Sequence, residues 1–166
     1  MRALCLFLSI LCLSPGMAFS AERAKVVVPM TRPLTTSCVL DAARASGMPP
    51  AALFGLLATE GGSMSNTNGT WDLGCFQINT VHVNELAAMG IAPETLLRDG
   101  CVNAYAAAWL LRKEYERTGD LWLAIGAYHS RTPHRRDAYI RKVRTNLEEL
   151  RRRGISSLSS FQEAQP

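Results

Sequence analysis

Glu60 is the residue whose position most clearly suggests chemistry. It ends the run 51–60, which is otherwise built from Ala, Leu, Phe, Gly and Thr. A helix that is apolar nearly all round is buried, and its C-terminal end is the negative end of the helix dipole. Burial and the dipole both raise the pKa of a carboxyl group, and a carboxylic acid that stays protonated near neutral pH can serve a glycosidase as general acid. The position is also compatible with a solvated glutamate at an exposed helix end.

Metal chemistry is not indicated by the other reactive residue types. His82, His129 and His134 form no ligand pair at helical or zinc-finger spacing. The cysteines are too widely spaced for a zinc ribbon. The sequence therefore predicts no metal site and no organic cofactor.

The composition is that of an ordinary globular protein. The 166 residues, 48% of them hydrophobic and 19% charged, fit one domain and exclude a disordered polyelectrolyte. The 12 glycines and 8 prolines exclude collagen-like and low-complexity classes. The formal net charge is +4, which bears on association rather than on fold.

The first twenty residues are typical of a secretory signal peptide. Arg2 precedes an apolar stretch over 3–13, and small residues follow around Ala18 and Ser20. We expect a signal peptide over 1–20 and no integral membrane segment after its removal, because the apolar stretch is shorter than a membrane span. A buried N-terminal helix is the alternative. Export would leave three cysteines in a compartment that permits disulfides, with at most one intramolecular bridge among them.

The elements that must hold Glu60 in place are expected to be helices. Capping residues, prolines at helix starts and glycines after helix ends predict helices over about 36–45, 51–60, 80–89, 93–98, 101–117, 121–128 and 134–153. The Gly-, Ser- and Asn-rich stretch 63–74 is expected to be a loop, residues 21–35 an extended N-terminal arm, and residues 154–166 a flexible tail. Because no alternating strand pattern occurs, the predicted fold class is all or mostly α, with one domain over 36–153.

Three motifs follow Glu60 in a recognisable order. They are Ala58-Thr59-Glu60-Gly61-Gly62, Asp72-Leu73-Gly74-Cys75-Phe76-Gln77-Ile78-Asn79 and Ala124-Ile125-Gly126-Ala127-Tyr128-His129-Ser130. In order and spacing they resemble the catalytic domain of soluble-type lytic transglycosylases, relatives of goose-type lysozyme. The resemblance covers about 38–150 and implies an all-α, lysozyme-like (goose-type) transglycosylase domain. It implies periplasmic localisation and peptidoglycan glycan strands as the substrate.

The closest resemblance is to the small single-domain members associated with type III and type IV secretion and conjugation systems. These carry one cysteine before the first helix and another before the long helix, as Cys38 and Cys101 do here. The resemblance therefore implies a Cys38–Cys101 disulfide. Cys75, which stands where the family usually has an aliphatic residue, is then expected to be a buried free thiol.

The resemblance also implies a mechanism with one catalytic residue. Glu60 would protonate the glycosidic oxygen between N-acetylmuramic acid and N-acetylglucosamine, and its carboxylate would then accept the proton of the muramoyl C6 hydroxyl. That hydroxyl attacks C1 of its own sugar, which leaves a 1,6-anhydromuramoyl end and consumes no water. A second carboxylate is not needed, and Asn79 stands where goose-type hydrolases carry an acid.

Five further residues are predicted to bind substrate by the same resemblance. Gln77 can donate to and accept from an N-acetyl group, although it could equally brace its loop. Asn103 matches a family asparagine but is also compatible with a hydrogen bond in the first helical turn. Tyr128 is expected to face the cleft and hydrogen-bond Glu60 or the bridging oxygen, with core packing as the alternative. Tyr139 could supply an aromatic wall, and His129, which replaces a family asparagine, could donate to a sugar or be merely solvated.

Departures from the family pattern leave other readings open. Asp72 is expected to brace its loop, but it would matter if the enzyme were a goose-type muramidase that hydrolyses the glycan. A non-catalytic assembly factor that holds glycan or a secretion component in the same cleft is a second alternative. The segment 131–153 holds nine Lys or Arg against three acidic residues, a charge compatible with binding nucleic acid. Because the chain is expected to be exported, attraction to the anionic wall or to an apparatus partner fits its compartment better. A monomer is expected.

Overall fold

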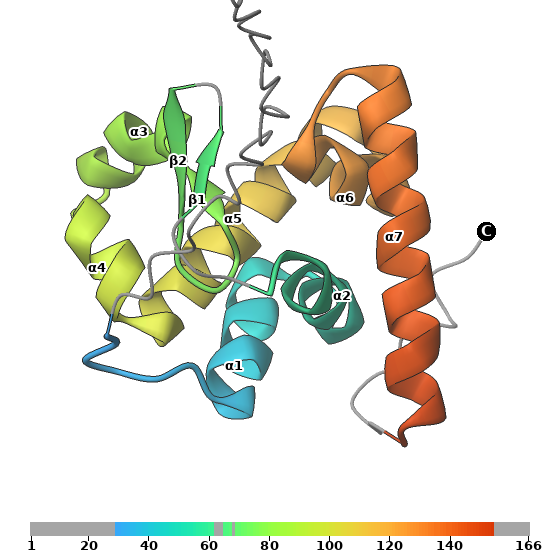
Figure 1. Cartoon of the computed structure of the whole chain (residues 1–166), viewed down its shortest axis with the longest axis horizontal. Helices are drawn as coiled ribbons and strands as arrows, with labels where there is room; N and C mark the ends of the chain where they lie inside the picture. Colours follow the sequence, from blue (N-terminus) through green and yellow to red (C-terminus); the bar gives the residue numbers. More distant parts are fainter. Residues whose placement is uncertain (1–28, 62–64, 68, 155–166) are drawn as a thin grey trace, which may run out of the picture.

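The structure is a computed structural model that describes residues 29–61, 65–67 and 69–154 (Figure 1). The expected signal peptide, the first part of the N-terminal arm and nearly all of the expected tail lie outside the described residues. The described part of the arm lies against the start of the long helix. Gly100 N–H donates to the Arg32 carbonyl over 2.8 Å, and Thr31 N–H donates to the Arg98 carbonyl over 2.9 Å.

The described chain contains the seven helices expected from the sequence. They are α1 (Thr36–Ser46), α2 (Pro50–Glu60), α3 (Val83–Ala88), α4 (Pro93–Arg98), α5 (Gly100–Thr118), α6 (Leu121–His129) and α7 (Pro133–Arg152). A short 3-10 turn, η1 (Thr80–His82), precedes α3. The expected fold class, all or mostly α, is therefore confirmed.

Side-chain caps and prolines account for the helix starts. The Asp99 carboxylate accepts hydrogen bonds from the first N–H groups of α5, and Asp120 does the same for α6. Prolines occupy the first turns of α2, α4 and α7, where a missing N–H leaves no bond unmade. The cap of α1 is Thr35, whose side chain accepts a hydrogen bond from Cys38 N–H.

The expectation of a loop over 63–74 is wrong for most of that stretch. A small antiparallel sheet is formed by β1 (Ser65–Thr67), β2 (Thr70–Leu73) and β3 (Ile78–Asn79), in the order β1-β2-β3. Thr67 pairs with Thr70, so only two residues separate the first two strands. In the sequence these are Asn68 and Gly69, the dipeptide that favours a tight hairpin turn. The strands are too short and too polar to show a period of two in the sequence.

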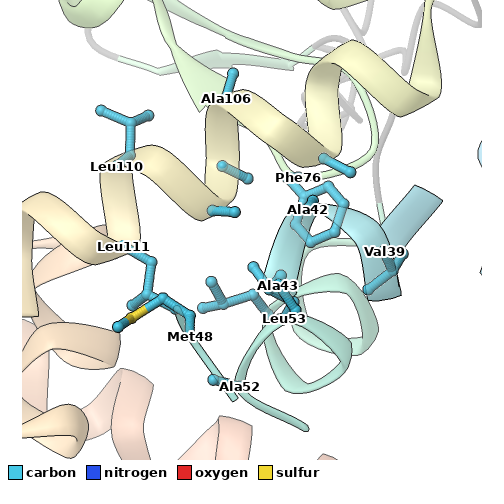
Figure 2. Close-up of a cluster of buried hydrophobic side chains, with 14 of the residues drawn as sticks. Val39, Ala42, Ala43, Met48, Ala52, Leu53, Phe76, Ala106, Leu110 and Leu111 are labelled. Atoms are coloured by element: carbon cyan, nitrogen blue, oxygen red, sulfur yellow. The ribbon is translucent and has the colours of Figure 1, made fainter. Parts of the chain in front are cut away.

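The buried core forms around α5. This helix packs against α1, α4 and α6, and Figure 2 shows apolar side chains of α1, α2 and α5 in one cluster with Phe76, which lies beside Ala42. The disulfide between Cys38 and Cys101 joins α1 to the start of α5, with a Cα–Cα distance of 5.0 Å. The predicted pairing is confirmed. It closes a loop across 63 positions of the sequence.

Helix α7 lies beside α2 and α6 along one side of the molecule (Figure 1). Its close approach depends on glycine. A Cβ atom added to Gly55 of α2 would lie 2.8 Å from Val143 Cγ1 and 3.0 Å from Leu147 Cγ, distances that real Cβ atoms do not tolerate. In α6, a Cβ on Gly126 would lie 2.8 Å from Ile140 Cγ1. Small residues on α2 and α6 therefore fix the position of α7 and of the tyrosine it carries.

Candidate active site

A cleft of about 560 Å³ opens between the end of α2, the small sheet and the end of α6. Glu60 lines it at the end of α2, Asp72 at β2, and Tyr128 and His129 at the end of α6. Gln77 lines it from the turn between β2 and β3. These five residues were singled out from the sequence, where they lie up to 69 positions apart, and the fold brings them to one cavity.

Glu60 is half-buried at the C-terminal end of α2, where Gly61 ends the helix with a φ of 54°. The Tyr139 hydroxyl donates to Glu60 Oε1 over 2.5 Å. Burial raises the pKa of Glu60 above its ordinary value, and the negative charge of Asp72 adds to this, while the Tyr139 hydrogen bond and the charge of Lys142 oppose it. The net result is a carboxyl group that holds its proton more firmly than a solvated glutamate.

Tyr128 lines the cleft as expected, but the hydrogen bonds of the two tyrosines near Glu60 differ from those expected. The Tyr128 hydroxyl donates to the Phe76 carbonyl over 2.8 Å, and no hydrogen bond to Glu60 is among its described contacts. Tyr139, expected as an aromatic wall, is buried behind Glu60 and makes that hydrogen bond instead. Burial, together with the charge of Glu60, holds the pKa of both phenols well above the ordinary value. Both therefore stay neutral donors.

His129 lines the cleft with its ring stacked on Tyr139. The ring centroids are 4.5 Å apart and the planes differ by 5°. Partial burial lowers the pKa of His129, and the positive charges of Lys142 and Arg135 lower it further, while Asp72 opposes them. The imidazole is therefore uncharged at neutral pH, and its stacking restricts the phenol that contacts Glu60.

Asn103 holds the turn that carries Gln77 through hydrogen bonds to its backbone. Gln77 has a φ of 48°, which is uncommon for a residue other than glycine, and its Nε2 donates to the Gly74 carbonyl over 2.8 Å. Asn103 is fully buried; its Nδ2 donates to the Leu73 carbonyl over 3.0 Å and its Oδ1 accepts from Phe76 N–H over 2.8 Å. Asn103 is not among the residues that line the cleft, and its hydrogen bonds are those of the alternative, a structural role. Its contacts position the turn.

Asp72 makes the bracing contact expected from the sequence. Asn79 Nδ2 donates to Asp72 Oδ1 over 2.8 Å and to Thr70 Oγ1 over 2.9 Å, across the pairing of β2 with β3. Asp72 also lines the cleft with Glu60. It is therefore both a structural residue and, with Glu60 and Glu114, one of the carboxylates that line the cavity.

Ion pairs that the sequence did not indicate line the far end of the cleft. Lys113 pairs with Glu85, whose Oε1 lies 2.6 Å from His82 Nδ1. Glu114 is 7% exposed and pairs with Arg131 over 2.5 Å. Burial alone would raise the pKa of Glu85 and Glu114, but their cationic partners hold both below the ordinary value. Contacts such as Glu114–Arg131, made across a helix and a turn, leave no local pattern in the sequence.

The remaining cysteine lies apart from the cleft. Cys75 is half-buried, with its Sγ 4.0 Å from Met30 Sδ, and burial raises the pKa of its thiol. In the part of the chain that the structure describes, no three His, Cys, Asp or Glu side chains are grouped as metal ligands. Over the same residues, no helix combines the length and apolarity needed to span a membrane.

Comparison with known proteins is consistent with this geometry. Residues 37–149 match the transglycosylase SLT domain. The chain is 37% identical over 90 residues to the invasion protein IagB of Salmonella typhimurium (strain SL1344), an alignment that covers 52% of this chain and 56% of that protein. It is 40% identical over 76 residues to an X polypeptide of Escherichia coli, covering 42% and 45% of the two chains.

A third relative is the protein IpgF of Shigella flexneri, 39% identical over 67 residues, or 40% of this chain and 44% of that protein. The chain thus spans about half the length of the curated relatives it matches. The family match, over residues 37–149, is longer than any of these alignments, and it takes in the helix that ends at Glu60 and most of the helix that carries Tyr139. The chain belongs to the transglycosylase SLT domain family.

Proposed function

We propose that this protein is a peptidoglycan lytic transglycosylase with Glu60 as its only acid and base. The observation that carries the proposal is the Glu60 carboxyl group itself. It faces a cleft, its pKa is raised by burial, and it is held by the Tyr139 hydroxyl. A glycosidic oxygen needs such a proton donor, and positioned proton transfer contributes on the order of 100- to 10,000-fold to a rate.

The proposed reaction proceeds at the bond between N-acetylmuramic acid and N-acetylglucosamine. Glu60 gives its proton to the bridging oxygen as the bond from C1 of the muramoyl residue breaks. The C6 hydroxyl oxygen of the same sugar forms the new bond to C1, and its proton passes to the Glu60 carboxylate. The product is a 1,6-anhydromuramoyl end, no water is consumed, and Glu60 ends the cycle protonated, as it began.

Other cleft residues position the acid and the glycan in this proposal. Tyr139 fixes the Glu60 carboxyl group, and the His129 ring keeps Tyr139 in place by stacking on it. Gln77 offers an amide to the substrate from a turn whose backbone is held by Asn103. Tyr128 links α6 to the same turn through the Phe76 carbonyl.

Digestion of purified peptidoglycan tests the reaction. The protein from residue 21 onward is compared with its Glu60→Gln variant, and the released muropeptides are identified by mass spectrometry. We expect products one water lighter than hydrolytic ones, reduced by at least about 100-fold in the variant. A folded, disulfide-bonded protein that releases nothing would overturn the assignment and leave a glycan-binding assembly factor.

A muramidase is the second candidate, because Asp72 lines the same cleft as Glu60 and its charge acts on Glu60. A hydrolase would use a second carboxylate to direct water or to stabilise the sugar cation. Products with a reducing muramic acid end, lost in Asp72→Asn, would identify it. Under the transglycosylase proposal, Asp72→Asn keeps the anhydro products.

We further propose that the protein acts in the periplasm after removal of a signal peptide over 1–20, as a monomer that opens the wall for an envelope-spanning secretion, conjugation or pilus machine. The Cys38–Cys101 disulfide supports an oxidising compartment. The name of the related invasion protein IagB agrees with such a role. Glycan strands and apparatus components, not nucleic acid, are the proposed partners. Fractionation of cells that express the tagged protein tests the location.

A further inference from the structure

The cations around the cleft differ in whether an anion already neutralises them. Three of them line the cavity: Lys113, Arg131 and Arg135. Glu85 neutralises Lys113, and Glu114 neutralises Arg131. Arg135, at the start of α7, is exposed, and its side chain makes no hydrogen bond or ion pair with another described residue. Its guanidinium group is therefore available to an incoming anion.

Lys142 extends this charge along α7. Arg135, Tyr139 and Lys142 follow at intervals of four and three residues, which places them on one face of the helix. Tyr139 in the middle of that face contacts Glu60. Lys142 is exposed and, like Arg135, has no ion pair within the described residues, yet its charge acts on both Glu60 and His129. Two unneutralised cations thus flank the tyrosine that holds the candidate acid.

Most other basic side chains of α7 are already engaged. Arg136 pairs with Asp137 over 2.8 Å, Arg152 pairs with Glu149 over 2.5 Å, and Arg144 lies over the Trp122 ring. Arg141 is exposed and lacks a charged partner among the described residues, and neither it nor Lys142 lines the cleft. Arg141 lies about 100° around the helix from Lys142, however, and so away from the face that carries Tyr139. Availability and position on the Glu60 side therefore coincide at Arg135 and Lys142.

We propose that Arg135 and Lys142 form a binding site for a carboxylate carried at C3 of the muramoyl residue. This inference rests on the proposed function, because it takes the bond at C1 of that residue to lie at Glu60. C3 belongs to the same sugar ring, and its lactyl group ends either in a free carboxylate or in an acidic peptide. Cations with no existing partner can bind that carboxylate without first breaking an ion pair.

The test compares strands that differ only in charge. Peptide-bearing glycan strands are prepared with their carboxyl groups either free or converted to methylamides, and kcat/KM is measured on both at low ionic strength. We expect wild type to favour the charged strands about fivefold, as two exposed charge contacts allow. The ratio should fall close to one in Arg135→Gln/Lys142→Gln and at high salt. Arg141→Gln, which removes one charge from another face of α7, should keep the wild-type ratio.

Strands stripped of peptide by an amidase identify the source of the carboxylate, since they keep only the lactyl group. If methylamidation of these strands also lowers the rate, the lactyl carboxylate is bound; if it does not, the carboxylate belongs to the peptide. Equal wild-type rates on charged and amidated strands would overturn the proposal, as would an Arg141→Gln variant that loses the preference.

A binding experiment separates this inference from the proposed reaction. The Glu60→Gln protein is sedimented with charged and amidated strands, with and without the two substitutions on α7. Charge-dependent binding through Arg135 and Lys142 supports the site even if wild type releases no product, an outcome that would overturn only the reaction. Cleavage of both kinds of strand at one rate would leave the reaction standing and remove the site.

Discussion

Tyr139 is the residue on which the state of Glu60 depends most directly. Its hydrogen bond to Glu60 Oε1 lowers the carboxyl pKa and fixes the group toward the cleft. In Tyr139→Phe we expect the rate to fall about tenfold or more, the effect of losing a hydrogen bond to an ionisable group worth about 1.5–3 kcal/mol. Because the opposing contribution is gone, the Glu60 pKa should rise, and the alkaline limb of the rate profile should move to higher pH.

Initial rates of muropeptide release between pH 4 and 9 measure both effects. Tyr105→Phe is the matched control, since this tyrosine is 44% exposed on α5 and lies outside the cleft. An unchanged alkaline limb in Tyr139→Phe would contradict the role assigned to its hydroxyl.

Glu60 also makes the protein less stable at neutral pH. Its pKa is raised in the folded state, so its favourable contribution is complete below the ordinary value of 4.5 and is lost as the pH rises through the folded value. The free energy of unfolding of Glu60→Gln, measured in urea, should therefore increase relative to wild type between pH 4 and pH 8. Glu114→Gln should show the opposite trend, because the folded pKa of Glu114 is lowered and its contribution is lost on acidification.

Sequence reasoning could find Glu60 but not its partner. The carboxylate was visible because it ends an apolar helix, which is a local pattern. Tyr139 lies 79 positions away, and only the packing of α7 on α2 brings the two together. The burial of Asn103 beneath the Gln77 turn is hidden from the sequence for the same reason, since it depends on tertiary packing.

At the scale of elements, the contact between α2 and α7 sets the position of Tyr139. Gly55→Ala would place a Cβ atom against Val143 and Leu147, both fully or nearly buried. Overpacking costs about 1–3 kcal/mol, partly offset by the better helix propensity of alanine, so we expect a net loss of about 1 kcal/mol in urea unfolding. Because α7 is displaced, activity per folded molecule should fall as well.

Ala45→Gly is the control for that activity measurement. Ala45 is exposed near the end of α1, and glycine there lowers stability by about 1 kcal/mol through helix propensity alone. This variant should keep the activity of wild type at a temperature where both are folded. Equal activities per folded molecule of Gly55→Ala and wild type would contradict the prediction that the α2–α7 contact positions Tyr139 for catalysis.

The helices could be predicted and the sheet could not, for a physical reason. Helix ends depend on caps and prolines that are adjacent in sequence, such as Asp99 before α5 and Pro93 at the start of α4. Strands β1, β2 and β3 are two to four residues long and depend on backbone pairing with one another. Asn68-Gly69 was the one local sign of the hairpin.

At the scale of the whole molecule, the disulfide restricts the unfolded chain more than it alters the folded one. A loop across 63 positions gives about 4 kcal/mol on the chain-entropy model. We expect Cys38→Ala/Cys101→Ala to lose a comparable free energy of unfolding in urea, and wild type to lose it on reduction. Cys75→Ala should remain as sensitive to reductant as wild type, because its thiol is free.

The same disulfide separates the residues around Glu60 into two groups, those inside the covalent ring and those that follow it in the sequence. The covalent ring from Cys38 to Cys101 contains Glu60, Asp72 and Gln77, while Tyr128 and Tyr139 come after it. The ring limits how far its own segments can separate but places no covalent limit on α6 and α7. An opening in which α6 and α7 detach together would leave Glu60 in the disulfide-closed part of the chain, without its hydrogen bond from Tyr139. Such an opening would stop catalysis while the disulfide still limited the separation of α1, α2 and the small sheet, and catalysis would return when the two helices re-docked.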